Sequence, residues 1–176
     1  MAVKRGQLIF FFGPAGSGKS TLAKAWCGTR ERAAHIELDE IRSFIVSGLA
    51  DPQSDSPLVS AQYETSVDAC CAIARSFVSD GYDTAIDDAA APTDFTRYWE
   101  PNLAGLNWQI VVIRPDLETA FRRNEERAKS VKRDIIRRQH SASGDWPTDV
   151  TVDTTGISVG VSLERVLQVL ESGDLL

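Results

Sequence analysis

The sequence predicts a three-layer α/β domain built on a parallel β-sheet. Apolar runs of strand length alternate with segments of helical spacing, and the first run leads through a glycine-rich loop into a helix. That run, residues 7–12, is apolar at nearly every position, as in a strand covered on both faces. Strands that alternate with helices form β-α units, and the crossovers make neighbouring strands parallel.

Five short segments are predicted as strands. The second is brief, the third runs into a pair of aspartates, and the fourth is the apolar stretch WQIVVI. The fifth is a short β-branched stretch late in the sequence. In chain order the predicted strands are residues 7–12, 35–38, 84–88, 108–113 and 150–152.

Seven segments are predicted as helices from the spacing of their apolar residues. The longest has an apolar face that includes Val67, Cys70 and Ala74, and Gly81 ends it. The prolines, serines and aspartates before it predict a loop over residues 47–60. In chain order the predicted helices are residues 19–27, 39–46, 61–78, 95–103, 117–127, 131–139 and 163–170.

Length and composition fit a single cytoplasmic domain over residues 1–176. Of the 176 residues, 43% are hydrophobic and 25% are charged, and the sequence shows neither an internal repeat nor an inter-domain linker. The net charge of −6 argues against a protein whose main role is to coat duplex DNA or an anionic membrane. The three cysteines are predicted to be reduced, and the N-terminal apolar run is too short for a signal peptide or a membrane span. The oligomeric state stays open.

A phosphate-binding motif lies between the first strand and the first helix. Gly13, Gly18, Lys19 and Ser20 fit the pattern G-x-x-x-x-G-K-[ST]; a glycine-rich turn with a chance lysine is the plain alternative. Glycines let backbone N–H groups point at phosphate oxygens, and the following helix adds its positive end. The lysine would bridge the β- and γ-phosphates of a nucleoside triphosphate, and the serine would ligate Mg²⁺. The predicted nucleotide-binding residues of the loop are Gly13, Pro14, Ala15, Gly16, Ser17, Gly18, Lys19, Ser20 and Thr21.

The stretch LDEIR places a carboxylate and a guanidinium three residues apart after the second strand. Asp39 and Arg42 would share one face of a helix. Asp39 could accept a proton from a substrate hydroxyl, while Arg42 orients a substrate anion or developing phosphate charge. The same spacing fits a structural pair, in which an aspartate N-cap is followed by a solvated arginine.

Two aspartates end the third strand, in the stretch TAIDDAA. An acid at the carboxyl end of a parallel strand can hold Mg²⁺ directly or through water. Asp87 directly continues the strand and is the predicted metal residue beside Ser20, with Asp88 as the other choice. The alternative is a pair of aspartates that only cap the loop.

The stretch RRNEERAKSVKR is predicted to form part of a mobile lid over residues 122–140. Arg123 and Arg127 are four residues apart and would share a helix face, and further basic residues follow. Taken alone, such a run is typical of a solvated helix with Glu–Arg pairs. After a phosphate loop, the arginines are expected to bind the nucleotide, exclude water and neutralise charge on the transferring phosphate.

Together these motifs resemble the small P-loop kinases, which include the kinase domain of polynucleotide kinase, chloramphenicol phosphotransferase, gluconate kinase and the zeta toxins. The resemblance spans residues 8–170 and rests on the phosphate loop, Asp-x-x-Arg, the Asp-ended strand, Arg-Asn-x-x-Arg and the late DTTG. It implies a P-loop NTPase fold with a five-stranded parallel sheet in the order 2-3-1-4-5 and a helical lid. It also implies that Asp39 activates the acceptor hydroxyl and that VTVDTTG passes near the adenine.

The predicted function is transfer of the γ-phosphate of Mg·ATP to a hydroxyl of a small molecule, such as an antibiotic, nucleoside or sugar. The first alternative is a 5′-hydroxyl kinase of polynucleotides or modified nucleotides, although DDAAAP stands where the polynucleotide kinase branch often has Asp-Thr-Asn. The second alternative is a non-catalytic ATP-binding regulatory module. The sequence lacks the guanine-recognition motif Asn-Lys-x-Asp, which argues against a GTPase. The predicted catalytic residues are Asp39, Lys19, Arg42, Arg123 and Arg127, and the metal residues are Ser20 and Asp87.

Aromatic and histidine residues give weaker signals. His35 and His140 are predicted to be structural or surface residues, because no spacing typical of metal ligands is present. Four aromatic side chains could stack on an acceptor, with core packing as the preferred interpretation: Tyr63, Tyr98, Trp99 and Trp146.

Overall fold

Five parallel strands form one sheet at the centre of the structure. The computed structural model describes residues 5–52, 54, 56–127 and 130–172. Within these residues the strand order is β2-β3-β1-β4-β5, which confirms the predicted fold class. The strands are β1 (Leu8–Phe12), β2 (Ala33–Glu37), β3 (Asp83–Asp88), β4 (Trp108–Ile113) and β5 (Thr151–Val152).

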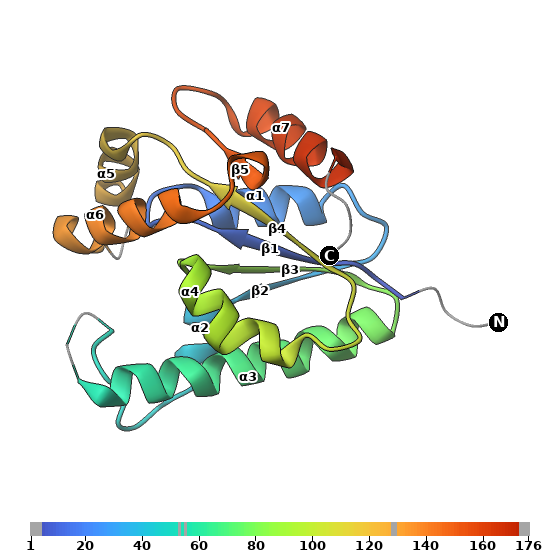
Figure 1. The fold of residues 1–176 in the computed structure, drawn as a ribbon, viewed down its shortest axis with the longest axis horizontal. Coiled ribbons are helices and arrows are strands. Elements are labelled where there is room, and N and C mark those ends of the chain that lie inside the picture. The colour runs from blue at the N-terminus through green and yellow to red at the C-terminus, as the bar shows by residue number, and fades with distance from the viewer. Residues whose placement is uncertain (1–4, 53, 55, 128–129, 173–176) are drawn as a thin grey trace.

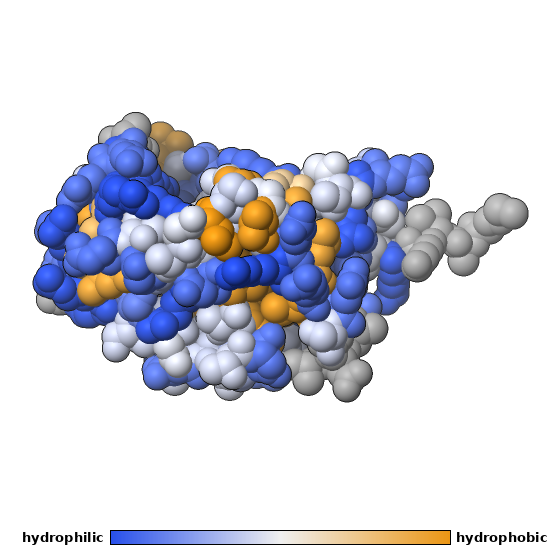
Figure 2. All heavy atoms as spheres, turned by 90° about the horizontal axis from the view of Figure 1, so that it is seen from above, coloured by the Kyte–Doolittle hydropathy of each residue, from blue (hydrophilic) through white to orange (hydrophobic). Residues whose placement is uncertain are grey.

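Helices cover both faces of the sheet (Figure 1). α1 (Lys19–Cys27) and α7 (Val159–Ser172) lie on one face, and α3 (Pro57–Ser79) lies on the other together with α4 (Pro92–Asp94). Seen from the α7 side, the surface is mainly hydrophilic, with hydrophobic residues gathered near its middle (Figure 2). No helix in the described part of the chain has the length and apolarity needed to cross a membrane.

β1 contributes to both cores, and this explains its unbroken apolar sequence. Phe10 and Phe12 pack with α3 and with Trp99, whereas Ile9 and Phe11 pack against α1 and α7. Successive side chains of a strand point to opposite faces, so a strand covered on both sides needs an apolar residue at every position. The three consecutive phenylalanines therefore belong to the buried centre of the sheet and not to a binding surface.

α3 begins at Pro57, earlier than the predicted start at residue 61. Ser56 is its N-cap, and the Ser56 hydroxyl accepts a hydrogen bond from the backbone N–H of Leu58. A proline at the first helical position lacks only an N–H that would have no helical partner. The predicted loop over residues 47–60 is thus wrong in its last part, where the Ser-Pro pair starts the helix.

Other predicted boundaries are wrong by a few residues. The helix predicted over residues 39–46 is α2 (Leu38–Arg42). Ile41 packs against the core, whereas Phe44, beyond the end of the helix, is 71% exposed. The segment predicted as a helix over residues 95–103 consists of a π-turn and a 3₁₀ turn that continue α4. The remaining observed bounds are Phe95–Trp99 for that π-turn, Glu100–Asn102 for that 3₁₀ turn, α5 (Leu117–Glu125), α6 (Arg133–Ala142), and further 3₁₀ turns at Ser143–Asp145 and Thr148–Val150.

α5 and α6 form a hairpin beside the carboxyl end of the sheet (Figure 1). The side chain of Asn124 joins α5 to the segment just before α6, because it accepts the N–H of Val131 and donates to the carbonyl of the same residue. Phe121 packs in a small core with Ala15 of the glycine-rich loop. The backbone N–H of Ala15 also donates to Oε1 of Gln139 over 3.0 Å. Both helices of the hairpin therefore contact the glycine-rich loop. Residues 128–129 of the predicted lid lie outside the described residues.

Replacing Phe10 by alanine is expected to lower the free energy of unfolding by about 3–5 kcal/mol, because the ring is fully buried and its loss leaves a cavity beside β1. The matched control is Phe44→Ala, which removes a ring that is 71% exposed and should change this free energy by less than about 0.5 kcal/mol. Urea denaturation followed by far-UV circular dichroism measures both. Equal effects of the two substitutions would contradict the burial of β1.

Candidate active site

The loop after β1 follows a backbone path that favours glycine. The φ angle is +79° at Gly16 and +94° at Gly18, in the left-handed region. A Cβ on Gly16 would lie 2.1 Å from the carbonyl oxygen of Ala120, so the loop touches α5 through the backbone itself. α1 begins at Lys19, directly after the loop, and leaves the N–H groups of its first turn without helical partners. The loop and the helix start therefore form a cradle for an anion.

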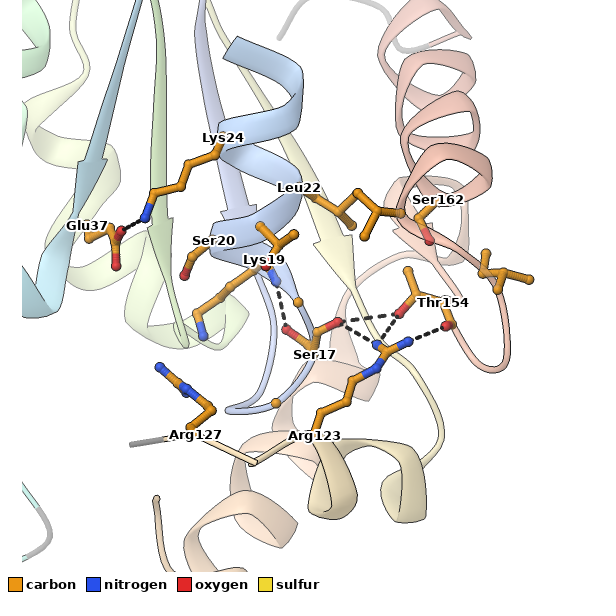
Figure 3. Close-up of a pocket in the computed structure, with 15 residues that line it drawn as sticks. Ser17, Lys19, Ser20, Leu22, Lys24, Glu37, Arg123, Arg127, Thr154 and Ser162 are labelled. Carbon is orange, nitrogen blue, oxygen red and sulfur yellow. Dashed lines mark hydrogen bonds and ion pairs between the residues drawn. The ribbon is translucent and has the colours of Figure 1, made fainter. Parts of the chain in front are cut away.

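A cavity of about 450 Å³ opens beside this cradle (Figure 3). Residues 16–21 line one side of it, and the α5–α6 hairpin and the segment after β5 line the others. Figure 3 shows Leu22 on one side of the cavity and Lys19 and Arg127 on the other. Val159 adds to its apolar lining. The cavity thus combines a cationic region with an apolar one, as a nucleoside phosphate requires.

The first three residues of the predicted nucleotide-binding set are not among the described residues that line this cavity. A Cβ on Gly13 would lie 2.2 Å from a carbonyl oxygen of β4, so this glycine packs against the strand. The carbonyl of Pro14 accepts the N–H of Ser17, and Ala15 lies in the small core under the hairpin. These three residues determine the shape of the loop, and residues 16–21 face the cavity.

The two predicted lid arginines take different positions. α5 ends at Glu125, so Arg127 lies beyond the helix and the predicted shared helix face is wrong. The Arg123 guanidinium donates to the carbonyl of Ser17 and to Oγ1 and the carbonyl of Thr154, over 3.1, 3.2 and 3.0 Å (Figure 3). The Arg127 side chain is exposed, lines the cavity, and has no hydrogen bond or ion pair with another described residue. Arg127 is therefore the arginine that can turn to a bound ligand.

Ser20, Asp87 and His35 form a chain of hydrogen bonds at the carboxyl end of the sheet. Ser20 Oγ donates to Oδ1 of Asp87 over 3.0 Å, and Nε2 of His35 donates to Oδ2 over 2.6 Å. Beside them, Nζ of Lys24 lies 2.6 Å from Oε1 of Glu37, and this hydrogen bond raises the pKa of the lysine. The sequence interpretation missed His35 as a partner of Asp87. The signal lay in the parallel register, which pairs Glu37 with Asp87 and places His35, two residues earlier, on the same face.

Asp39 and Arg42, the predicted acceptor pair, both belong to α2 but differ in exposure. Asp39 is exposed near the start of the helix. Arg42 is only 9% exposed, and its Nη2 donates to the carbonyl of Ala50 over 3.4 Å. Its Nε has no hydrogen-bond partner among the described residues. No carboxylate of the described residues forms an ion pair with the Arg42 guanidinium. A buried guanidinium without a carboxylate is costly, so this arrangement suits an incoming anion.

Asp88 is held by side chains from the α3 face of the sheet. The Tyr63 hydroxyl donates to Oδ2 of Asp88 over 2.6 Å, and Nε1 of Trp99 donates to the Tyr63 oxygen over 3.1 Å. Burial raises the pKa of Asp88 to about 6, and the negative charge of Asp39 adds to the rise. The Tyr63 hydroxyl and the positive charge of Lys19 act in the opposite direction on this pKa. Asp88 ends β3 level with the end of β1, next to the start of the phosphate loop.

The other aromatic residues and the second histidine have structural positions. Trp146 is 9% exposed and stacks on Phe12, with 5.5 Å between the ring centroids. Tyr98 is half-buried against the same core. Nε2 of His140 donates to the carbonyl of Pro115 over 2.9 Å, which ties α6 to the segment before α5. Core packing, the preferred interpretation of these aromatic residues, is what the structure shows for Trp146 and Tyr98.

Comparison with known proteins identifies a family and a shared fold. Residues 8–145 match the family described as AAA domain. No curated protein matches the sequence.

Several solved structures align over nearly the whole chain. The tunicamycin resistance protein of Deinococcus radiodurans is 18% identical, with a TM-score of 0.65 and 98% of each chain covered. APS kinase of Mycobacterium tuberculosis, solved with AMPPNP and APS, is 18% identical, with a TM-score of 0.65, and the alignment covers 96% of this chain and 99% of that one. A chain of the Pnkp1/Rnl/Hen1 RNA repair complex is 15% identical, with a TM-score of 0.61, and the alignment covers 97% of this chain and 47% of that one. The chain therefore has the fold of P-loop kinases, as the resemblance implied.

Replacing Asp88 by asparagine is expected to change how stability depends on pH. The pKa of Asp88 is raised to about 6 from 3.8, so the folded protein binds this proton more tightly than the unfolded chain. The contribution of Asp88 to the free energy of unfolding should therefore fall as the pH rises from about 4 to about 6. Asparagine does not ionise, and its Oδ1 can still accept from Tyr63. The stability of Asp88→Asn relative to wild type should increase by about 1–3 kcal/mol over this range.

Urea denaturation at pH 4 and pH 7 measures this difference for each protein. Asp145→Asn is the matched control, because Asp145 is exposed on the surface, and its difference from wild type should stay nearly constant. A constant difference for Asp88→Asn as well would show that burial does not disfavour the Asp88 carboxylate.

Proposed function

The chain belongs to the AAA domain family, and from this membership and the geometry of the cavity we propose that it transfers the γ-phosphate of ATP to a hydroxyl group of a small molecule. The observation that carries the proposal is the Ser20–Asp87 hydrogen bond at the end of the loop, with Lys19 beside it. Asp39 and Asp88 lie near the same edge of the sheet, because β2 and β3 end side by side in the parallel register and α2 begins directly after β2. A donor cradle and acceptor-side carboxylates thus meet at one end of the sheet.

The cradle would hold the triphosphate of ATP. Backbone N–H groups of residues 16–20, other than that of Ser17, which bonds Pro14, would face the phosphate oxygens together with the positive end of α1. Lys19 would place its charge between the β- and γ-phosphates. Leu22 and Val159 offer apolar surface for the nucleoside. The adenine end of the site would be completed by the segment after β5, which contains Thr154.

Ser20 and Asp87 are the residues that would hold Mg²⁺. Their hydroxyl and carboxylate oxygens lie 3.0 Å apart, and Mg²⁺ prefers such hard oxygen ligands. One carboxylate and one hydroxyl suit an ion that keeps several waters and also binds phosphate oxygens, so the donor set fits the metal. Bound there, the ion would supply positive charge against the phosphate oxygens.

Asp39 would act as the general base on the acceptor side. Its carboxylate takes the proton of the acceptor hydroxyl while the hydroxyl oxygen bonds to the γ-phosphorus in line with the leaving group. The bond from that phosphorus to the β,γ-bridging oxygen breaks, and ADP leaves with the electron pair. Arg42, whose buried guanidinium lacks an anionic partner among the described residues, would align an anionic group of the reacting pair.

The α5–α6 hairpin would close the site, as a lid over residues 122–140 of a single kinase domain. Arg127 is the exposed arginine of the cavity and would turn to the transferring phosphate, where it neutralises charge. Arg123 already bonds Ser17 and Thr154, and it would keep the wall beside the nucleotide in place. Closure of such a hairpin excludes water from the reacting phosphate.

A small acceptor, such as an antibiotic, nucleoside or sugar, is favoured over nucleic acid. Basic residues of α6 are engaged by neighbours: Arg133 pairs with Glu125 at 2.6 Å, and Arg138 lies 3.7 Å from Asp134. The net charge of −6 also disfavours a nucleic-acid surface. The likeness to a chain of an RNA repair complex supports the second candidate, a 5′-hydroxyl kinase of polynucleotides or modified nucleotides.

The test of the proposal is release of ADP from Mg·ATP in the presence of candidate acceptors. Panels of nucleosides, aminoglycosides, sugars and 5′-hydroxyl oligonucleotides should include a small molecule that raises the rate at least about tenfold over water alone. Stimulation by oligonucleotides alone supports the second candidate. Binding of ATP without stimulation by any panel supports a non-catalytic regulatory module and contradicts the proposal.

Asp39→Asn is expected to lower the rate of phosphate transfer by about 10²- to 10⁴-fold, because the amide cannot take the acceptor proton. Binding of a fluorescent ATP analogue should stay within about twofold, since Asp39 does not line the nucleotide cavity. Glu40→Gln, at the next position of α2 and also exposed, is the matched control and should transfer at the wild-type rate. Transfer by Asp39→Asn at the wild-type rate would exclude Asp39 as the base.

The two acceptor classes differ in how their binding depends on salt. A small acceptor should keep its KM within about threefold between 50 and 200 mM KCl, because few counterions are released when it binds. A polynucleotide acceptor contacts several phosphates and should lose more than about tenfold in affinity over the same range. Initial rates at several salt concentrations, with the acceptor from the screen, give the slope, and a steep slope would overturn the small-molecule assignment.

A further inference from the structure

We propose that His35 is a positioning residue for the magnesium site: its imidazole holds the Asp87 carboxylate in the orientation that faces Ser20. This inference rests on the proposed function, because it concerns the same site. His35 is not among the described residues that line the nucleotide cavity. It therefore acts through Asp87 and not through contact with ATP.

Two donors from different elements hold the two oxygens of one carboxylate. Ser20 of α1 donates to Oδ1 over 3.0 Å, and His35 of β2 donates to Oδ2 over 2.6 Å. The terminal torsion of an aspartate is soft and nearly two-fold, so the strand backbone alone leaves its carboxylate plane undefined. With Oδ2 bonded to the imidazole, Oδ1 faces Ser20. The pair thus presents the oxygen ligands in one fixed arrangement.

Burial strengthens this hydrogen bond. The side chain of His35 is 11% exposed and that of Asp87 is 5% exposed, so little water competes for either group. A carboxylate only accepts hydrogen bonds, and Nε2 of the imidazole must therefore carry the proton. Partners behind a metal ligand commonly change metal affinity by about 10- to 100-fold when they are removed.

The neighbouring acid does not compete for the imidazole. Oε1 of Glu37 lies 3.8 Å from Nδ1 of His35, too far for a hydrogen bond, and only 2.6 Å from Nζ of Lys24. The ligand atoms of His35, Glu37 and Asp87 lie within 4.8 Å of one another, as in a cation site. The imidazole and the Asp87 carboxylate bond each other, and Lys24 engages Glu37, so this group is better explained as support for Asp87.

The bond to Asp87 is also not needed to join the strands. β2 and β3 already pair through five consecutive register positions, from Ala33 with Asp83 to Glu37 with Asp87. The backbone already joins β2 to β3. The bond from His35 therefore serves to orient the Asp87 carboxylate at the end of β3. A purely structural role predicts a change in stability alone, whereas a positioning role predicts a change in the Mg²⁺ requirement.

Three substitutions separate these roles. Glutamine at position 35 carries an amide nitrogen the same number of bonds from Cα as Nε2 of histidine, so His35→Gln keeps the donor. His35→Asn brings the donor one bond closer to the backbone and away from Asp87, and His35→Leu removes it. The measured quantity is the Mg²⁺ concentration that gives half of the metal-dependent gain in binding of mant-ATP, together with mant-ATP binding in EDTA.

His35→Leu and His35→Asn are expected to raise the half-saturating Mg²⁺ concentration by about 10- to 100-fold, and His35→Gln should stay within about threefold of wild type. Binding in EDTA should be the same for all four proteins within about twofold. If the leucine variant does not fold, the glutamine and asparagine variants decide, because both keep a polar side chain.

An unchanged Mg²⁺ requirement in the variants that lack the donor overturns the positioning role. Equal weakening by glutamine, asparagine and leucine overturns it too, because it means that the imidazole acts through something other than the Nε2 donor. Wild-type protein that does not bind mant-ATP overturns the proposed function, and the inference with it. Wild-type binding that depends on Mg²⁺, with unaltered variants, leaves the proposed function intact and rejects only the role of His35.

Discussion

The burial of β1 on both faces is the constraint on which the site depends. Because every residue of this strand is enclosed between two cores, the glycine-rich loop leaves the sheet at one point and in one direction. The parallel register sets Asp87 and Asp88 level with Phe11 and Phe12, next to the start of that loop. α1 begins directly after the loop, so only a short segment separates Ser20 from the end of β1. This brings the Ser20 hydroxyl to Asp87 at the end of the neighbouring strand. The packing of the core around β1 therefore fixes the position of the phosphate-binding loop.

The alternation of a strand also explains why two adjacent aspartates have different surroundings. Asp87 points to the α1 face, where Ser20 and His35 bind it, and Asp88 points to the α3 face, where Tyr63 binds it. The two aspartates at the end of β3 are adjacent in sequence, and each belongs to a different half of the site. In the proposed reaction, one half serves the phosphate donor and its metal, and the other serves the acceptor.

Local patterns predict the strands, the phosphate loop and the faces of the long helices, because these follow from short-range spacing and glycine placement. The order of the strands in the sheet is implied by the resemblance to the small P-loop kinases and not by spacing. The limits appear where a partner is distant in sequence. His35 is unremarkable until the register of β2 against β3 brings it to Asp87. Arg123 bonds Thr154, which follows β5 and lies 31 residues further along the chain, and α2 ends before the exposed Phe44. Spacing cannot supply such tertiary contacts, and they account for the errors at the lid and at the helix ends.

The contacts between the loop and the hairpin have a consequence for how the protein responds to ligands. Gly16 packs against the backbone of Ala120, and Ala15 is hydrogen-bonded to Gln139. The glycine-rich loop and the α5–α6 hairpin are therefore in direct contact at two adjacent residues. If the hairpin closes as proposed, its tilt would shift the amides of the loop, and an anion that orders those amides would favour one tilt over another. Linkage makes this effect reciprocal and equal in free energy in both directions. In the proposed kinase, phosphate binding and closure of the hairpin would therefore be coupled.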